Sequence, residues 1–201
     1  MELTLYYMPR TRSERVRWTL DELGLAYQVK FIDLFKGEGN RAEYRAVHPL
    51  GQLPALLIDG QAMFESGAIV HWLAEAMPGS GLAPPVDHPA RQRFDQWMYF
   101  AATSLEAPAW ERVLHGKILP GEQAVTAIIP FARQQYQAAL QVLEQALADQ
   151  DYLLGNAFTA ADIMAGYLLP WFPEDLDGLP VLQAYLERLQ QRPAYPRDPL
   201  Q

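Results

Sequence analysis

The sequence of 201 residues predicts an α/β segment followed by an all-helical segment. Strand and helix patterns alternate up to residue 76, whereas only helix patterns follow residue 90. Between them, residues 78–89 contain four prolines and two glycines, which interrupt regular structure. We therefore expect residues 1–77 and 90–201 to form two domains joined by this linker.

The first segment is expected to have the element order β-α-β-α-β-β-α. Its strands are short apolar or alternating runs, and its helices carry apolar residues three or four positions apart. Gly24 fits the left-handed position after the first helix, and Asp59-Gly60 predicts a hairpin between the last two strands. This hairpin makes the sheet mixed rather than purely parallel. The expected elements are strands at 3–7, 27–34, 54–58 and 61–64, and helices at 13–23, 41–47 and 66–76.

The second segment is predicted to be a helical bundle. Pro130 is expected to kink or interrupt its longest helix, because proline has no backbone N–H to donate. Thr159 and Asp162 have the spacing of a capping box, in which each side chain bonds the backbone of the other residue at a helix start. We assign this pair a structural role. The expected helices span residues 91–114, 122–147, 160–169 and 181–189.

The composition excludes several classes of function. The formal net charge is −8, so we expect no nucleic acid and no anionic membrane as partner. The chain has no cysteine, which excludes a disulfide scaffold and any cysteine-based redox or nucleophilic chemistry. Its four histidines lack metal-ligand spacing, and we expect no metal site. The N-terminus lacks a signal-peptide pattern and no apolar run could span a bilayer, so we expect a cytoplasmic protein.

Pro54 opens the expected strand 54–58, a position where proline is tolerated. If the Leu53–Pro54 bond is cis, the Leu53 backbone turns outward, and its N–H and C=O can pair with an extended peptide. The alternative is a trans proline at an ordinary strand start. For a proline taken alone this is the commoner case, since only about 5–6% of such bonds are cis.

The Glu65-Ser66 pair stands at the start of the expected helix 66–76. Ser66 is a natural N-cap, and the amides at a helix start bind carboxylates. Glu65 beside it could pair with an ammonium group, so the two residues together suit the head of an α-amino acid. The alternative, which we favour for the pair alone, is a capping serine beside a solvated glutamate.

Taken together, four features resemble the glutathione S-transferase superfamily. They are the Gly51-Gln52-Leu53-Pro54 loop, the Glu65-Ser66 pair, the proline-rich linker and the Thr159–Asp162 capping box. The resemblance covers nearly the whole chain and is to bacterial-type cytosolic members outside the cysteine-type classes. It implies a thioredoxin-like N-terminal domain followed by an all-helical domain.

The resemblance also implies a binding site for glutathione as a cosubstrate. Leu53, at the corner made with Pro54, would pair through its backbone with the cysteinyl part of the tripeptide. Glu65 and Ser66 would hold the γ-glutamyl head, and Gln52 would help to bind the tripeptide. The further candidates are Lys36 and His48 for the glycine carboxylate. Independently of the resemblance, the cluster of Arg10, Arg12, Arg15 and Arg17 is expected to make this end positive, which suits an anionic tripeptide and a thiolate. The alternative is a solvated helix face with one buried ion pair, and we expect Arg12 at the site and Arg17 in the structural role.

Activation of the glutathione thiol requires a hydrogen-bond donor, because a free thiol has a pKa of about 8.5 and is mostly protonated at neutral pH. Thr11 stands where serine-type members carry serine, and we place it first. Tyr6 matches the tyrosine of the tyrosine-type classes and comes second, although an ordinary place in the sheet core is an equal alternative. Ser13 comes third, because it could simply cap the first helix.

The function implied is conjugation of the glutathione thiolate to a small hydrophobic electrophile, as in detoxification, or a related glutathione-dependent isomerisation. The alternative is a non-catalytic ligand-binding or protein-interaction module. The resemblance further implies a homodimer formed through the helices that begin at Ser66 and Arg91. An apolar pocket for the electrophile is expected between the domains, and its candidate residues are Trp97, Tyr99, Phe100, Trp110, Trp171 and Phe172.

Overall fold

The computed structural model describes residues 1–197 and divides the chain into two units. Of the described residues, the first unit contains Met1–Ala83 together with 193–197, and the second contains Pro84–Arg192. The division falls inside the expected linker. The predicted helical domain, residues 90–201, includes 193–197, which instead pack with the first unit, and 198–201, which lie outside the described residues.

The first unit is a four-stranded sheet with three helices. Its elements are β1 (Leu3–Tyr7), α1 (Ser13–Glu22), β2 (Gln28–Phe31), a 3₁₀ turn at Glu38–Asn40, α2 (Ala42–Arg45), β3 (Ala55–Ile58), β4 (Gln61–Phe64) and α3 (Ser66–Ala76). The strand order is β2-β1-β3-β4, with β1 parallel to β2 and antiparallel to β3, and β3 antiparallel to β4. This confirms the predicted β-α-β-α-β-β-α order and the mixed sheet.

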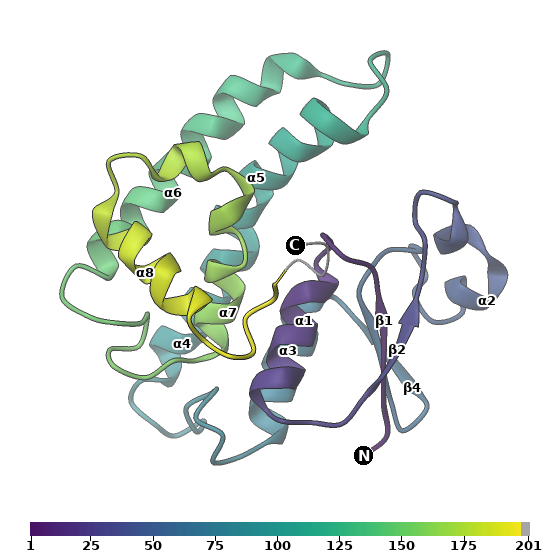
Figure 1. Ribbon diagram of the computed structural model, residues 1–201, viewed down its shortest axis with the longest axis horizontal. Coiled ribbons are helices and arrows are strands. Elements are labelled where there is room, and N and C mark those ends of the chain that lie inside the picture. Colours follow the sequence, from purple (N-terminus) through teal and green to yellow (C-terminus); the bar gives the residue numbers. More distant parts are fainter. Residues whose placement is uncertain (198–201) are drawn as a thin grey trace. The chain divides into compact units, whose positions relative to one another are not determined.

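The alternation of side chains along β1 explains how the helices cover the sheet. The Tyr7 hydroxyl donates to Glu14 of α1 at 2.7 Å, whereas the ring of Tyr6, on the opposite face, packs 5.3 Å from the ring of Tyr44 in α2. Accordingly, α1 and α3 lie on one side of the sheet and α2 lies on the other (Figure 1).

Local signals account for several boundaries in this unit. Gly24 has a φ of 61° and its N–H bonds the Asp21 carbonyl at 3.1 Å, as predicted for the residue that ends α1. The strand β2 is shorter than the expected strand 27–34, because β1 offers it partners only as far as Tyr7. The Asp59-Gly60 turn joins β3 and β4 as predicted.

The second unit is helical, as predicted. Its α-helices are α4 (Arg91–Phe100), α5 (Glu106–Val113), α6 (Ile129–Ala146), α7 (Ala160–Gly166) and α8 (Pro180–Gln190). Two π-helical turns, Ala101–Leu105 and Leu114–Ile118, flank α5, and 3₁₀ turns occur at Thr126–Ile128, Leu169–Trp171 and Pro173–Leu176. In the part of the chain that the structure describes, no helix is both long and apolar enough to cross a membrane.

Two prolines shape the long helices of this unit. The expected helix 122–147 begins only at Ile129, because Pro130 lies in the first turn, where a missing N–H costs no helical hydrogen bond. The proline therefore starts α6 rather than kinking it. The expected helix 91–114 is present as α4 and α5, which are joined without a break by the π-helical turn Ala101–Leu105 ahead of Pro108, a residue with no N–H to bond back to the preceding turn.

The start of α7 carries the predicted capping box. The Thr159 N–H donates to Asp162 Oδ2 at 2.8 Å, and the Thr159 side chain accepts the Asp162 N–H. The other carboxylate oxygen, Oδ1, accepts the Leu153 N–H at 2.9 Å and the Tyr185 hydroxyl at 2.8 Å. The Asp162 side chain is fully buried, so these donors replace the water that it loses on folding.

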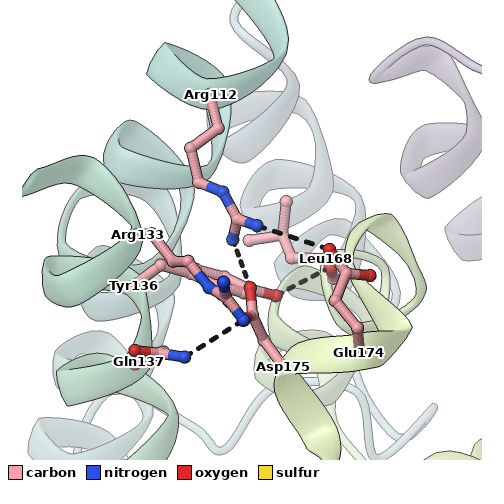
Figure 2. Close-up of polar contacts among 7 residues, drawn as sticks. All are labelled: Arg112, Arg133, Tyr136, Gln137, Leu168, Glu174 and Asp175. Carbon is pink, nitrogen blue, oxygen red and sulfur yellow. Dashed lines mark hydrogen bonds and ion pairs between the residues drawn. The ribbon is translucent and has the colours of Figure 1, made fainter. Parts of the chain in front are cut away.

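A second buried carboxylate joins α5 and α6 to the segment that precedes α8 (Figure 2). Asp175 accepts from Arg112, from Arg133 Nε at 2.8 Å and from Gln137 Nε2 at 3.1 Å. The Arg112 guanidinium also lies 3.4 Å from the centroid of the Phe172 ring. Phe172, one of the expected pocket aromatics, is therefore covered by a cation within the core of this unit.

Candidate functional site

The strand registers bring the predicted site segments to one end of the sheet. Tyr6 pairs with Ala55, which pairs in turn with Phe64, and Tyr7 pairs with Phe31. The end of β1, the end of β2, the start of β3 and the end of β4 therefore lie side by side. The segments that continue from them carry the predicted site residues Thr11, Arg12, Ser13, Lys36, Gln52, Leu53, Pro54, Glu65 and Ser66.

The Leu53–Pro54 corner leads directly into β3. Its peptide bond is cis. The Leu53 side chain is buried in an apolar cluster with Tyr6, Tyr44 and Ala55. Gln52, which precedes the corner, is exposed. The Leu53 side chain thus anchors the corner to the sheet, and the Gln52 residue before it is open to solvent.

The start of α3 has an unusual backbone and no side-chain cap. Glu65, not Ser66 as expected, is the N-cap residue, because the Glu65 carbonyl accepts the Ile69 N–H at 2.9 Å. Glu65 has a φ of 70° and a ψ of 103°, a conformation that costs a non-glycine residue on the order of 1–3 kcal/mol and is typical of ligand sites. Glu65 is exposed, whereas Ser66 is buried as the first residue of the helix. Backbone amides at such a helix start suit a carboxylate ligand.

The Thr11 and Ser13 hydroxyls form a triangle with the Met8 carbonyl. Thr11 Oγ1 lies 2.7 Å from the Met8 oxygen, Ser13 Oγ lies 2.9 Å from it, and the two hydroxyl oxygens are 2.6 Å apart. Two hydroxyl protons serve these three contacts, so one proton joins the two hydroxyls and the other goes to Met8. When Ser13 donates to Thr11, the Thr11 proton is the one directed at Met8.

The three candidate donors differ in their exposure. Ser13 is fully buried and, contrary to the capping alternative, Arg12 rather than Ser13 occupies the N-cap position of α1. Tyr6 is 8% exposed, and its ring packs in the apolar cluster with the Lys30 ammonium 5.4 Å from the ring centroid. Thr11 is half-buried. Of the three residues, Thr11 is therefore the most exposed.

The arginines of the cluster occupy different environments. Arg15 is fully buried, whereas Arg12 is half-buried beside Thr11. Arg17 donates to the Tyr7 hydroxyl at 3.3 Å and lies 3.7 Å from an Asp21 oxygen. Arg17 is thus tied to Tyr7 and Asp21, whereas Arg12 directly follows the candidate donor Thr11 in the sequence.

Lys36 and His48, the candidates for the glycine carboxylate, differ in their exposure and in their charge. The Lys36 side chain is 77% exposed, and its ammonium pairs with Asp33 at 3.1 Å. His48 is buried, and its ring lies 5.1 Å from that of Phe64. Burial lowers the pKa of His48, and its Nδ1 accepts the Leu50 N–H at 3.3 Å. His48 therefore offers a neutral ring with the proton on Nε2 rather than a positive charge.

Sequence reasoning missed the residues that support the Leu53 corner. Tyr44 donates a hydrogen bond to the Gln52 carbonyl, and Arg45 donates to the Pro49 carbonyl at 2.7 Å. Neither residue carries a motif, and the only available signal was an aromatic residue in a weak helix pattern. Among residues 1–197, no group of three or more histidine and acidic residues could hold a metal ion.

Both parts of the chain match models of one protein family. The model described as glutathione S-transferase, N-terminal domain, matches residues 1–75, and that described as glutathione S-transferase, C-terminal domain, matches residues 71–188. Glutathione S-transferase GstA of Escherichia coli O157:H7 is 32% identical over an alignment of 196 positions, which covers 95% of this chain and 94% of that protein.

Two solved structures resemble the chain over most of its length. A glutathione transferase from Methylococcus capsulatus str. Bath has a TM-score of 0.84 and 31% identity, covering 96% of this chain and 95% of that one. A glutathione transferase homologue from Sulfitobacter with bound glutathione has a TM-score of 0.84 over the same shares, and at 24% identity it shows the fold alone. The chain therefore belongs to the glutathione S-transferase superfamily, with a thioredoxin-like N-terminal domain followed by a helical C-terminal domain.

Proposed function

We propose that this protein is a glutathione transferase that joins the glutathione thiolate to small hydrophobic electrophiles. The observation that carries the proposal is the shared sheet end, where the Leu53 corner precedes β3, the Glu65-Ser66 helix start follows β4 and Thr11 follows β1. A peptide-pairing corner, an amino-acid clamp and a hydroxyl donor are the three parts that binding and activating glutathione require.

In this proposal the tripeptide lies across the sheet end. The Leu53 backbone pairs with the cysteinyl residue, and Gln52 contacts the tripeptide beside it. The first-turn amides of α3 and the Ser66 hydroxyl bind the γ-glutamyl carboxylate, while Glu65 accepts from its ammonium group. His48 and Lys36 serve the glycine carboxylate, and Arg12 adds positive charge near the sulfur.

Thr11 acts as the donor that favours the thiolate. Its proton turns from the Met8 carbonyl to the sulfur, while Ser13 keeps donating to Thr11 Oγ1. A hydroxyl that accepts one hydrogen bond becomes a better donor in the next, so Ser13 strengthens Thr11. The bound thiol then loses its proton to solvent, and the thiolate forms the carbon–sulfur bond as the leaving group departs with its electron pair.

The proposal is tested by calorimetry and by the thiolate absorbance of bound glutathione as a function of pH. We expect the wild-type protein to bind glutathione, and Thr11→Ala to raise the pKa of the bound thiol with little loss of affinity. Thr11→Ser should keep the low pKa, and Tyr6→Phe should leave it unchanged. A lack of binding heat with millimolar glutathione, or an unchanged thiol pKa in Thr11→Ala, would contradict the proposal.

Turnover with a panel of electrophiles separates the three candidate roles. Conjugation of an aromatic electrophile supports the transferase, and turnover of a double-bond isomer alone identifies the isomerase. Binding without turnover across several electrophile classes would instead identify a ligand carrier. We further propose that the protein is a cytoplasmic homodimer whose interface is formed by α3 and α4. Elution from gel filtration at the size of a monomer would contradict the dimer.

A further inference from the structure

The loop that leads into the Leu53 corner is held by the short helix α2. This helix has four residues, and Tyr44 is its one buried side chain. Its other residues, Ala42, Glu43 and Arg45, are exposed. The attachment of α2 to the sheet therefore depends on Tyr44, whose ring shares the apolar cluster with Tyr6 and Leu53.

The Tyr44 hydroxyl donates to the carbonyl of Gln52. That carbonyl and the Leu53 N–H belong to the same peptide group. The group is planar, and in a trans peptide the N–H points away from the C=O. Because the carbonyl faces Tyr44 in the cluster, the Leu53 N–H is directed away from the cluster. One side-chain hydrogen bond thus sets the direction of the backbone donor at the corner.

The tyrosine can act as this donor at any pH used for assays. Burial raises the pKa of Tyr44 well above its ordinary value, with a smaller contribution from Tyr6. The hydroxyl therefore stays protonated, and its effect on the corner should not change with pH between neutrality and the alkaline range.

Further contacts tie the same loop to the turn before α2. Arg45 donates to the Pro49 carbonyl at 2.7 Å and to Asn40 Oδ1 at 2.8 Å. Gly39 and Gly51 approach so closely that a Cβ on either would lie 2.2 Å from the carbonyl oxygen of the other. The backbone on both sides of α2 is thus packed without room for adjustment, which suits a rigid support.

We propose that Tyr44 is a positioning residue for glutathione, which acts by holding the Gln52 carbonyl so that the Leu53 N–H faces the cysteinyl carbonyl of the tripeptide. This inference rests on the proposed function, because it assumes that glutathione pairs with Leu53. It assigns to α2 the role of a brace for the binding corner.

The test compares Tyr44→Phe with Tyr136→Phe. Tyr136 is a buried tyrosine of the helical unit whose hydroxyl donates to the Leu168 carbonyl at 3.1 Å, so the control deletes the same kind of hydrogen bond elsewhere. We expect Tyr44→Phe to weaken glutathione binding roughly fivefold, the size of one lost hydrogen bond. The kcat and the pKa of the bound thiol should stay as in the wild type, and Tyr136→Phe should leave the glutathione Kd unchanged.

Three outcomes would overturn the inference. They are a Tyr44→Phe Kd within about twofold of the wild type, equal weakening by both tyrosine variants, and a loss confined to kcat. If Tyr44→Phe does not fold, the variant Arg45→Gln is used instead, because Arg45 is exposed and the change removes its hydrogen bond to the Pro49 carbonyl. Weaker glutathione binding at unchanged kcat would then support the role of α2 as a brace. Unchanged binding would overturn it. Failure of the proposed function is distinct, because the wild type itself would then not bind glutathione.

Discussion

Two helix starts, one in each unit, combine a hydroxyl and a carboxylate in different ways. At α7, the Thr159 hydroxyl accepts the Asp162 N–H and the Asp162 carboxylate accepts the Thr159 N–H, and both side chains are buried. At α3, the Glu65 carboxylate is exposed, no side chain caps the helix, and Glu65 itself has a positive φ. In the first arrangement the side chains form hydrogen bonds with each other's backbone groups. The second leaves a strained helix start with an exposed carboxylate at the proposed binding site.

The difference follows from spacing. An acid three residues after the hydroxyl lies one turn along the helix and can bond back to the cap, as Asp162 does. An acid directly before the hydroxyl, as at Glu65-Ser66, cannot close that box. Sequence spacing therefore separates a helix start that stabilises the fold from one that we propose binds a ligand.

The largest expected effect is the loss of stability in Asp162→Asn. The buried carboxylate accepts from the N–H groups of Leu153 and Thr159 and from the hydroxyls of Thr159 and Tyr185. An amide presents its own N–H groups to some of these donors, so we expect the free energy of unfolding to fall by about 3–5 kcal/mol. Urea unfolding measures this, and a loss below about 1 kcal/mol would show that the network is not a stabilising one.

The corresponding replacement of an acid by its amide at the start of α3 is expected to have an intermediate effect, on glutathione binding rather than on stability. Glu65→Gln should change the free energy of unfolding by no more than about 0.5 kcal/mol, because the side chain is exposed. It should weaken glutathione binding roughly tenfold through the lost charge opposite the tripeptide's ammonium group. If Glu65→Gln bound glutathione normally and unfolded as readily as Asp162→Asn, the contrast between the two helix starts would be lost.

The smallest expected effect concerns the stability of the first unit at alkaline pH. Burial, the hydrogen bond to Glu14 and that residue's charge raise the pKa of Tyr7 to about 12, against the opposing effect of Arg17. Tyr7 thus contributes stability that is complete below its unfolded pKa of about 10 and is lost as the pH rises towards 12. Tyr7→Phe should flatten the fall in unfolding free energy over this range, measured by urea titrations against the control Tyr99→Phe at an exposed ring. An equally steep fall in Tyr7→Phe would contradict the assignment.

Short-range signals predicted the fold well. The Gly24 cap, the Asp59-Gly60 hairpin and the bounds of α3 each depend on residues within a few positions of one another. Pro130 indicated that the helix 122–147 would be kinked or interrupted, but the sequence alone did not show that the helix would begin beside this proline. The identity of the N-cap at α3 depended on the hydrogen bond to the Glu65 carbonyl, which the residue types do not specify.

Contacts between distant residues could not be predicted. The sequence indicated the corner at Leu53, but its support by Tyr44 depends on how α2 folds back onto the sheet. Likewise, Arg112 and Asp175 are separated by 63 residues, and no pattern links them. The triangle at Met8, which distinguishes Thr11 from Ser13, required the positions of both hydroxyls.

The central claim is that the start of α3 binds a ligand while the start of α7 serves only the fold. A glutathione titration of isotope-labelled protein, followed by backbone amide NMR, tests it most directly. We predict saturable shifts at the Ser66 and Leu53 amides and none at the Asp162 amide. Unmoved Ser66 and Leu53 amides at saturating glutathione would contradict the claim.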